Sequence, residues 1–333
     1  MSDVEYTVYG YRLSYATRTA ELCLRWHRQP YGLQSLTWER RKALLPQEGV
    51  RSPVVVGGPH QQRLCSVLAL ADSLRTDQHD LQGEGPSAVL LRLLTMWCND
   101  WLWRMALSLR WNEDYDSGLA CDALAREHVP EAPPILLAAV KSFVGDWAIR
   151  ALRAWGCVSP EQQREIEHSF TLLCDAMQRQ LSLTPCLLGT SPCLIDMMLL
   201  GALRSHFAVD PKTRRVLTER PQLLTWLDAA SDMELWPRQR FHLETPSPFA
   251  RFILDHAQDY VRFLQANGAA VAKQAPVFTL QMAGEAVCFG VQADADHEWQ
   301  QCRAMAQQLT PPEQAQLAHW LDASAMADLL AAT

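Results

Sequence analysis

Ser14 is the first candidate for a chemically active residue, because it lies at a predicted junction between a strand and a helix. It lies in "YGYRLSYATRTAELCL", after a strand-like run and directly before a helical pattern. A serine there can end the strand and cap the helix, because its side-chain oxygen accepts a hydrogen bond from a first-turn N–H group. The same hydroxyl is also placed to act on a ligand. The local pattern leaves both roles open.

Arg12 and Arg18 flank this junction and can contact an anionic ligand. Residues 1–82 carry 10 Lys/Arg and 8 Asp/Glu, although the whole chain has a net charge of −7. A slightly basic N-terminal unit favours a small anion, but the excess of charge is small. An ordinary exposed surface arginine remains the alternative for each of the two side chains.

The composition argues against several classes of protein. The 333 residues are 48% hydrophobic and 20% charged, as in an ordinary globular protein. The acidic balance argues against nucleic-acid binding, and no apolar run is long enough to span a membrane. The first residues do not resemble a signal peptide, and the ten cysteines are scattered without a C-x-x-C pair. We therefore expect a cytoplasmic protein with reduced thiols, no metal site, and no nucleic-acid or membrane partner.

The elements around Ser14 predict a small α/β unit. Alternating Val, Thr and Tyr predict a strand over residues 4–9, and 30–36 and 52–58 are two further short strand candidates. A helical period begins at Tyr15, and a second helical pattern covers 64–74. The order β-α-β, then a strand, then a helix is typical of a compact α/β domain.

After a polar linker at 75–87, the patterns are almost wholly helical. Helices are predicted over 88–111, 133–156, 159–181, 192–207, 220–232 and 246–268. The third of these has a capping signature, with Ser159 as N-cap and Gln162 three residues later. A β-hairpin follows over 276–291, with Gly284 in its turn, and one or two amphipathic helices close the chain.

This order of segments resembles the glutathione transferase superfamily. The stretch "YGYRLSYATRTAELCL" is similar to the family's first strand, active-site turn and first helix, and "SPVVV" to the strand entered through a cis-proline. The segment "LLGTSPCLIDMMLLGALRSHFAVDP" resembles the one that opens the buried helix of the second domain, with Asp196 at its near-universal aspartate. "LTERPQLLTWLD" matches the helix after it. The resemblance spans roughly residues 4–232, and the tail looks like an extension of some long bacterial members.

The resemblance implies the fold and its division into domains. It implies an α/β thioredoxin-like N-terminal domain, an all-α glutathione-transferase C-terminal domain, and a C-terminal extension with a β-hairpin and helices. The expected boundaries are 1–82, 88–245 and 246–333.

The resemblance also implies that the glutathione thiol is the nucleophile. Ser14 would stabilise the thiolate together with backbone N–H groups and the dipole of the helix that follows. Ser52 would pair with the tripeptide through its backbone, and Pro53 would be the cis-proline, which X-Pro bonds adopt at low cost. Arg12 would contact the ligand. The alternative for Pro53 is an ordinary trans proline at the start of a strand.

The carboxylate-binding turn is the part that departs from the family. Members have an acidic residue followed by serine at the start of the third helix, whose N-terminus holds the γ-glutamyl carboxylate. Here the pair is Cys65-Ser66, so Ser66 supplies the hydroxyl, but the acid that would hold the ligand's ammonium group is missing. In another register, Cys65 takes the serine position, and 57–66 lacks a clear fourth strand. Asp100 is a candidate replacement for the acid, with a solvated carboxylate as the alternative.

A second pocket, for the electrophile, would be lined by the long helix over 88–111. Trp97, Trp101 and Arg104 recur at four- and three-residue spacing, so they share one helix face. Two indole rings and a guanidinium can stack on a flat aromatic or conjugated substrate. Packing between domains or subunits is the alternative.

Two classes of function follow. The first is a glutathione-dependent transferase or isomerase that acts on an electrophilic, aromatic or conjugated small molecule, with glutathione as co-substrate and secondary metabolism as one setting. A serine at the turn favours this chemistry over disulfide exchange, which needs a cysteine. The second is a non-catalytic binding or interaction protein of the same fold with a degenerate glutathione site. The resemblance also implies a homodimer.

Overall fold

The computed structural model describes residues 5–44, 54–58, 62–64, 66–76, 79–112 and 117–331. The chain divides into two compact units. Unit 1 comprises Met1–Leu81, Arg110–Ile149 and Asp196–Gln239. Unit 2 comprises Gln82–Leu109, Arg150–Ile195 and Arg240–Thr333. Unit 1 thus joins the N-terminal segment to two later helical segments, whereas the domain boundaries expected from the sequence stay a prediction.

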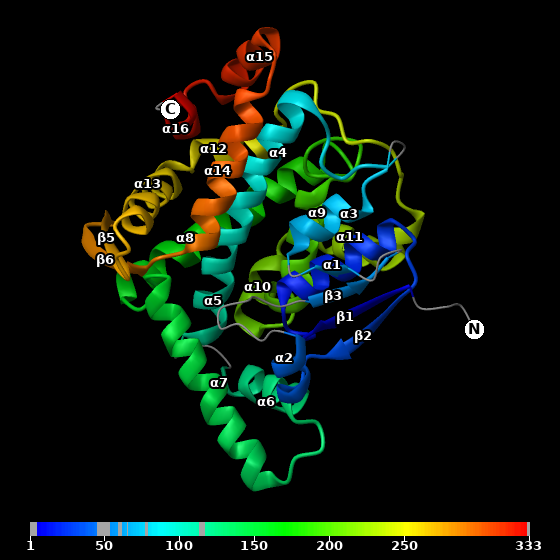
Figure 1. Ribbon diagram of the computed structural model, residues 1–333, viewed down its shortest axis with the longest axis vertical. Coiled ribbons are helices and arrows are strands. Elements are labelled where there is room, and N and C mark those ends of the chain that lie inside the picture. The colour runs from blue at the N-terminus through cyan, green and yellow to red at the C-terminus, as the bar shows by residue number, and fades with distance from the viewer. Residues whose placement is uncertain are drawn as a thin grey trace. The chain divides into compact units, whose positions relative to one another are not determined.

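Unit 1 is built on a mixed sheet of four strands (Figure 1). In spatial order they are β2 (Tyr31–Ser35), β1 (Tyr6–Gly10), β3 (Val54–Gly57) and β4 (Gln62–Leu64). β1 is parallel to β2 and antiparallel to β3, and β3 is antiparallel to β4. α1 (Tyr15–Trp26) connects β1 to β2, and α3 (Val67–Leu74) follows β4. This is a thioredoxin-like topology, and the predicted fold class is confirmed.

The strands form where alternating or continuous apolar residues can be buried. Val8, Val54 and Val55 are fully buried in the sheet, which accounts for the strands predicted from their sequences. β4 corrects the expectation that 57–66 lacks a clear fourth strand. It has three residues, and its register places Leu64 opposite Val55, so it is too short for a visible alternation.

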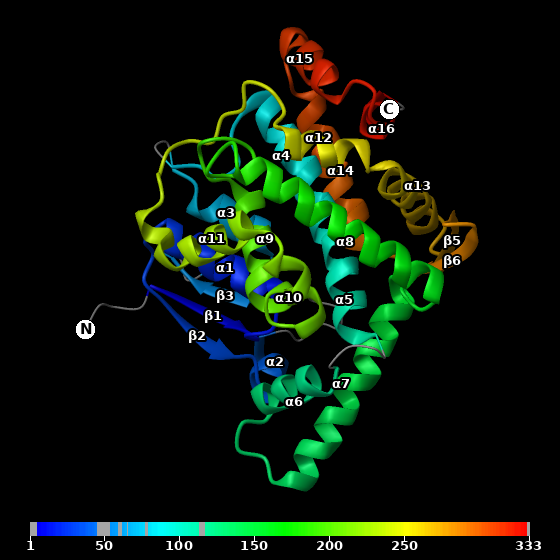
Figure 2. The ribbon, with the colours of Figure 1, turned by 180° about the vertical axis from the view of Figure 1, so that it is seen from behind.

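Helices cover the sheet of unit 1. α1 contacts α3 and β1, and also the later segments η2 (Leu203–Phe207) and η3 (Ala230–Leu235). The other helices with residues in this unit are α2 (Trp38–Leu44), the end of α5 (Trp103–Trp111), α6 (Ser117–His128), α7 (Pro134–Ala154), α9 (Leu194–Ala202), α10 (Pro211–Thr218) and α11 (Pro221–Ala229). Figure 2 shows α10 and α11 packed together in this unit. α2, α6 and α10 were not predicted from the sequence.

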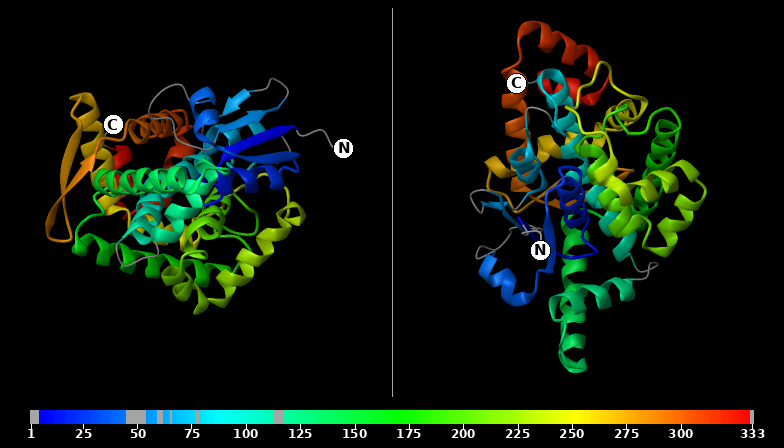
Figure 3. Two further views of the ribbon diagram at one scale, coloured as in Figure 1. Left: turned by 90° about the horizontal axis from the view of Figure 1, so that it is seen from below. Right: turned by 90° about the vertical axis from the view of Figure 1, so that its right-hand side faces the viewer.

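Unit 2 is helical apart from one hairpin. Its elements are α4 (Gly85–Trp97), η1 (Cys98–Leu102), α5 (Trp103–Trp111), α8 (Pro160–Leu181), α12 (Pro248–Asp255), α13 (Gln258–Ala272), β5 (Val277–Met282), β6 (Glu285–Gly290), α14 (Ala293–Gln307), α15 (Pro311–Leu321) and α16 (Ala325–Ala331). α14 and α15 pack on α4, and α12 packs on α8. The hairpin of β5 and β6 lies beside α13, as the left panel of Figure 3 shows.

The hairpin prediction is confirmed in position and in turn. Ala283 and Gly284 join the strands with φ angles of 48° and 83°. Two positive φ values suit the right-handed twist of a tight hairpin, and this is where glycine is favoured. Two of the predicted helices differ in the structure. The single helix expected over 88–111 contains a π-helical turn at η1, and the one expected over 246–268 breaks between α12 and α13.

Within the described ranges, no helix is long and apolar enough to cross a membrane. Of the nine cysteines that the structure describes, most are buried, and none of the nine is paired in a disulfide. In the same residues, no group of three His, Cys, Asp or Glu side chains is arranged to hold a metal ion.

Candidate functional site

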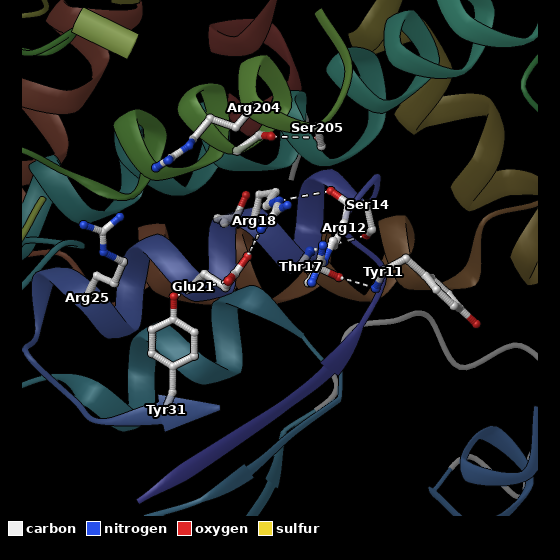
Figure 4. Close-up of polar contacts among 12 residues, drawn as sticks. Tyr11, Arg12, Ser14, Thr17, Arg18, Glu21, Arg25, Tyr31, Arg204 and Ser205 are labelled. Carbon is white, nitrogen blue, oxygen red and sulfur yellow. Dashed lines mark hydrogen bonds and ion pairs between the residues drawn. The ribbon is translucent and has the colours of Figure 1, made fainter. Parts of the chain in front are cut away.

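Ser14 is the N-cap of α1. Its backbone is extended, and its Oγ accepts a hydrogen bond of 3.3 Å from the backbone N–H of Thr17. This bond uses an oxygen lone pair, whereas the hydroxyl proton can still be donated to another acceptor. Capping the helix and donating to a bound anion are therefore compatible roles for this half-buried side chain (Figure 4).

The turn before Ser14 is fixed at its first residue by a close approach of β1 to α1. The backbone N–H of Tyr11 donates to Oγ1 of Thr17 at 3.3 Å. A Cβ on Gly10 would lie 2.2 Å from that same Oγ1, so glycine is required there. Thr17 is fully buried and thus holds both ends of the turn, through its side chain at Tyr11 and through its N–H at Ser14.

Glu127 of α6 and Arg18 of α1 hold the next residue of the turn. The backbone N–H of Arg12 donates to both carboxylate oxygens of Glu127, at 2.9 and 3.1 Å. The carbonyl of Arg12 accepts from Nε of Arg18 at 3.0 Å. Burial raises the pKa of Glu127, whereas the bond from Arg12 and the charges of Arg12 and Arg18 lower it. The Arg12 side chain itself is exposed, and its contact with a ligand stays a prediction.

Arg110 holds the carbonyl of the residue that precedes Ser14. Its side chain is 2% exposed and donates to the Leu13 carbonyl at 3.0 Å. Nε of the same guanidinium pairs with Asp210 at 3.0 Å, and it also bonds the Ser205 carbonyl. Burial lowers the pKa of Arg110, and Asp210 opposes that change. The Ser14 turn is therefore held by Thr17 and Arg18 of the adjacent helix, and by Glu127 and Arg110 from two distant segments of unit 1.

The hydroxyl of Tyr11 forms hydrogen bonds away from the Ser14 turn. It donates to the Leu36 carbonyl at 2.9 Å and lies 3.0 Å from Nδ1 of His128. Burial raises the pKa of Tyr11 to about 12. Its ring points away from Ser14 in Figure 4, so Ser14 rather than Tyr11 presents a hydroxyl at the start of α1.

The sheet brings Ser14 and Ser66 to one edge. β4 is antiparallel to β3, which is antiparallel to β1, so β1 and β4 run in the same direction. Ser14 follows the end of β1, and Ser66 follows the end of β4. β3 begins at Val54, opposite Tyr9 near the end of β1, and therefore starts at this edge as well.

Ser66 caps α3 as Ser14 caps α1. Its Oγ accepts from the backbone N–H groups of Leu68 and Ala69, at 3.1 and 3.4 Å. The first turns of α1 and α3 contain no acidic residue that would compete with a bound anion. Three other predicted residues, Ser52, Pro53 and Cys65, lie outside the described residues.

Trp97, Trp101 and Arg104 belong to unit 2, where they are 2%, 7% and 3% exposed. The Trp101 ring lies 5.3 Å from the Phe263 ring and 6.4 Å from Phe289, centroid to centroid. The Arg104 guanidinium lies over the Trp101 ring, 5.3 Å from its centroid. These contacts lie within unit 2, and the role of the three side chains in lining a substrate pocket stays a prediction.

Arg104 is bonded to the chain on several sides. Its Nε donates to the Trp155 carbonyl at 3.0 Å, and a second nitrogen donates to Oε1 of Gln162 at 2.6 Å. Gln162 in turn donates to the Met282 carbonyl in the hairpin at 3.3 Å. The N-cap predicted at Ser159 is confirmed by its bond from the Gln162 N–H, but the Gln162 side chain serves this network instead of reaching back to the cap.

Asp100 is neither solvated nor open to a ligand in unit 2. It is 3% exposed and accepts a hydrogen bond of 2.8 Å from the Tyr260 hydroxyl. This corrects the expectation of a solvated carboxylate. Asp196 is fully buried in the first turn of α9.

The sequence did not reveal the two side chains that hold the turn from afar. Arg110 and Glu127 contact residues 12 and 13 from about a hundred positions away in the chain. Arg110 had a weak signal, because it is a charged residue in a strongly apolar helical stretch. Glu127 had none, since α6 itself was not predicted.

No family model matches the chain, and no curated protein matches its sequence.

Several solved structures are similar to the chain. FzlA from C. crescentus is 19% identical over 75% of this chain and 92% of its own, with a TM-score of 0.42. The beta-etherase LigF from Sphingobium sp. strain SYK-6 is 13% identical over 69% of this chain and 98% of its own, with a TM-score of 0.48. A glutathione S-transferase of Ceriporiopsis subvermispora, solved in complex with glutathione, is 13% identical over 68% and 98%, with a TM-score of 0.46. The structure of the chain itself has the thioredoxin-like sheet that the sequence motifs predicted.

Proposed function

We propose that the protein is a glutathione-dependent transferase or isomerase that acts on an electrophilic, aromatic or conjugated small molecule. Glutathione is the co-substrate, and Ser14 is the residue that stabilises its thiolate. The observation that carries this proposal is the convergence of Ser14, the start of β3 and Ser66 at one edge of a thioredoxin-like sheet.

Two features of α1 support a thiolate at Ser14. A helix N-terminus carries a partial positive charge, which favours an anion, and the first turn of α1 has no carboxylate to oppose it. The Ser14 hydroxyl can donate to sulfur while Oγ accepts from Thr17. Both effects stabilise the charged form of the thiol, so they lower its pKa and raise the fraction of nucleophile at neutral pH. The thiolate then forms a C–S bond with the electrophilic carbon of the second substrate. In an addition, the π electron pair at that carbon moves onto the conjugated electron-withdrawing group, which takes a proton from water. In a displacement, the leaving group departs with its bonding electron pair.

The N-terminus of α3 supports a carboxylate at Ser66. Its hydroxyl and the first N–H groups of α3 can bind the γ-glutamyl carboxylate by the same physical principle. Ser52, Pro53 and Cys65 complete this proposed ligand set. Without an acid beside Ser66, the ammonium group of glutathione has lost its usual partner, so we expect weaker binding than in the family at large.

Equilibrium binding of glutathione to the wild type and to Ser66→Ala tests the proposal. We expect saturable binding to the wild type and a loss of about tenfold in Ser66→Ala, as for a hydrogen bond to a charged group. Ser73→Ala is the matched control, because Ser73 lies in the same helix and bonds the Leu70 carbonyl. Absence of binding up to about 10 mM glutathione, a concentration well above most metabolite affinities, would contradict the enzyme proposal.

The second candidate is a non-catalytic binding or interaction protein with a degenerate glutathione site. The observation that favours it is Cys65 in place of the family's acid. The binding measurement separates the two, because a degenerate site leaves glutathione unbound, whereas the transferase must bind it.

The proposal includes a homodimer in the cytoplasm. Exposed apolar side chains on α7 support a contact with a second copy, because monomers rarely leave such side chains together in water. They are Ile135, Leu136, Phe143, Trp147 and Ile149.

A further inference from the structure

Two arginine side chains of unit 1 meet at one backbone carbonyl. Arg25 of α1 and Arg204 of η2 both donate to the Ala230 carbonyl, at 3.5 and 3.3 Å. Figure 4 shows the two guanidinium groups directed toward one another from these separate elements. Groups of like charge held this close repel each other, and the repulsion is strongest where water is partly excluded.

The carboxylates around them do not balance this charge. Arg18 pairs with Glu21 at 2.7 Å, and Arg25 pairs with Glu234 at 2.7 Å. Arg204 has no carboxylate partner among the residues that the structure describes. A guanidinium has five N–H donors, and Arg204 uses one of them in the bond to the Ala230 carbonyl.

The arginines are recessed rather than fully solvated. The side chains of Arg18 and Arg25 are 27% and 24% exposed, and Arg204 is half-buried. Burial lowers the pKa of Arg204, and the charges of Arg25 and Arg18 lower it further, against the opposing effect of Glu21. The positive form of Arg204 therefore lies in an environment that disfavours it.

A purely structural role explains part of this cluster. Arginines near the end of a helix bond its last carbonyls, which carry partial negative charge. Arg25 bonds the Ser231 carbonyl, and Arg28 bonds the Glu234 carbonyl at 3.1 Å, so these two side chains tie η3 to α1. Arg204 adds a further positive charge beside η3, although Arg25 and Arg28 already connect η3 to α1.

We propose that Arg18, Arg25 and Arg204 form a binding site for a small oxyanion with at least two negative charges. Phosphate and carboxylate groups share this chemistry, because both match the planar fork of a guanidinium. Such an anion removes the repulsion between Arg25 and Arg204 and uses the donors that Arg204 has to spare. The site lies along α1 from Ser14 and does not depend on glutathione.

Titration calorimetry with inorganic pyrophosphate, and in a second arm with citrate, tests the site. We expect one saturable site in the wild type, and the arm that binds more tightly identifies phosphate or carboxylate as the natural group. Arg204→Gln weakens binding about tenfold or more, whereas Arg214→Gln, an exposed arginine of α10, changes it less than about twofold. Ser14→Ala leaves it unchanged, so a failure of the glutathione proposal is told apart from a failure of this one.

Two further variants keep the test decisive if Arg204→Gln does not fold. Arg204→Lys keeps the charge but loses the planar fork, and therefore weakens binding less than Arg204→Gln does. Glu21→Gln removes an opposing carboxylate and therefore tightens binding. A purely structural role for the arginines predicts no gain in Glu21→Gln. The proposal is overturned if neither anion binds the wild type up to about 10 mM, a weak limit for a charged site, or if Arg214→Gln weakens binding as much as Arg204→Gln does.

Discussion

The Ser14 turn owes its geometry to side chains that lie far away in the sequence. Glu127 accepts a hydrogen bond from the N–H of Arg12, and Arg110 donates one to the carbonyl of Leu13. The backbone of the two residues before Ser14 is therefore held in place. A hydroxyl that must donate to a thiolate gains from such support, because a misplaced donor loses much of its effect on the pKa.

Arg110→Gln should destabilise unit 1 and weaken glutathione binding together. The substitution leaves Asp210 without its buried partner and the Leu13 carbonyl without its donor, a change that costs about 3–5 kcal/mol. Urea unfolding measures the free energy, and the exposed Arg214→Gln is the control, expected to stay within about 0.5 kcal/mol of wild type. A wild-type free energy of unfolding in Arg110→Gln would show that the turn does not need this contact.

His27 should make unit 1 less stable in weak acid. Burial, with smaller contributions from His79 and Arg238, lowers the pKa of His27 to about 4 from its ordinary value of 6.5. Between these values the unfolded chain binds a proton that the folded chain does not, so the free energy of unfolding falls as the pH falls. The loss between about pH 7 and pH 5 is about 2 kcal/mol.

Thermal or urea unfolding of His27→Gln at both pH values measures this effect. The variant should lose less stability on acidification than the wild type, and His319→Gln, an exposed histidine, should behave like the wild type. Equal acid sensitivity in wild type and His27→Gln would contradict the assignment.

At the residue scale, the sequence led to Ser14 and Ser66 but not to their supports. The serines follow strand-like segments and precede helical ones, so the local sequence pattern is enough to identify them as helix N-caps. Arg110 and Glu127 reach the turn only through the tertiary fold, which no local pattern encodes.

Among the elements, those with a clear period were predicted and those without it were missed. The hairpin, α8 and the N-terminal strands have strong alternation or helical spacing bounded by turn or cap residues. The buried residues of α14 are Ala295, Trp299 and Cys302. Because the rest of its sequence is mostly polar, no apolar helical period was visible and the helix was not predicted. The π-helical turn at η1 adds a residue to a helical turn, which a helical period cannot reveal.

Gly156 gives a test of how the hairpin packs within unit 2. Its φ is +62°, and a Cβ there would lie 2.4 Å from Cγ1 of Val287 in β6. Gly156→Ala should therefore cost about 1–3 kcal/mol, from backbone strain and overpacking together. Gly145→Ala is the matched control, because a Cβ on this helical glycine meets nothing within 4 Å.

Gly145→Ala should be neutral or stabilise the protein by about 0.5–1 kcal/mol, since alanine favours a helix. Urea or thermal unfolding compares the two variants directly. If Gly156→Ala were as stable as Gly145→Ala, the close packing of the hairpin against residue 156 would be wrong.

At the scale of the whole molecule, the extension after residue 245 belongs to unit 2 and packs against its helices. Trp101 and Tyr260 rings lie 5.3 Å apart, and the Tyr260 hydroxyl bonds Asp100, so the extension supplies partners for η1. The sequence predicted the elements of this extension better than its role, because its packing partners lie about 160 residues away.

The exposed apolar face of α7 predicts a dimer that a polar substitution breaks. Phe143 is 43% exposed and Trp147 is 38% exposed, one helical turn apart. Phe143→Ser should shift the molecular mass by light scattering from dimer to monomer without loss of helical content. Leu183→Ser, an exposed leucine outside α7, is the control, and a wild-type monomer would contradict the dimer.

The most direct test of the central claim is the thiol pKa of bound glutathione, followed by thiolate absorbance in stopped flow. In the wild type, the pKa should lie below that of free glutathione, because the Ser14 hydroxyl and the N-terminus of α1 favour the thiolate. Ser14→Ala should raise it by about one unit or more, the effect of one hydrogen bond to a charged group. An unchanged pKa in Ser14→Ala, with glutathione still bound, would leave Ser14 as a helix cap and contradict the account.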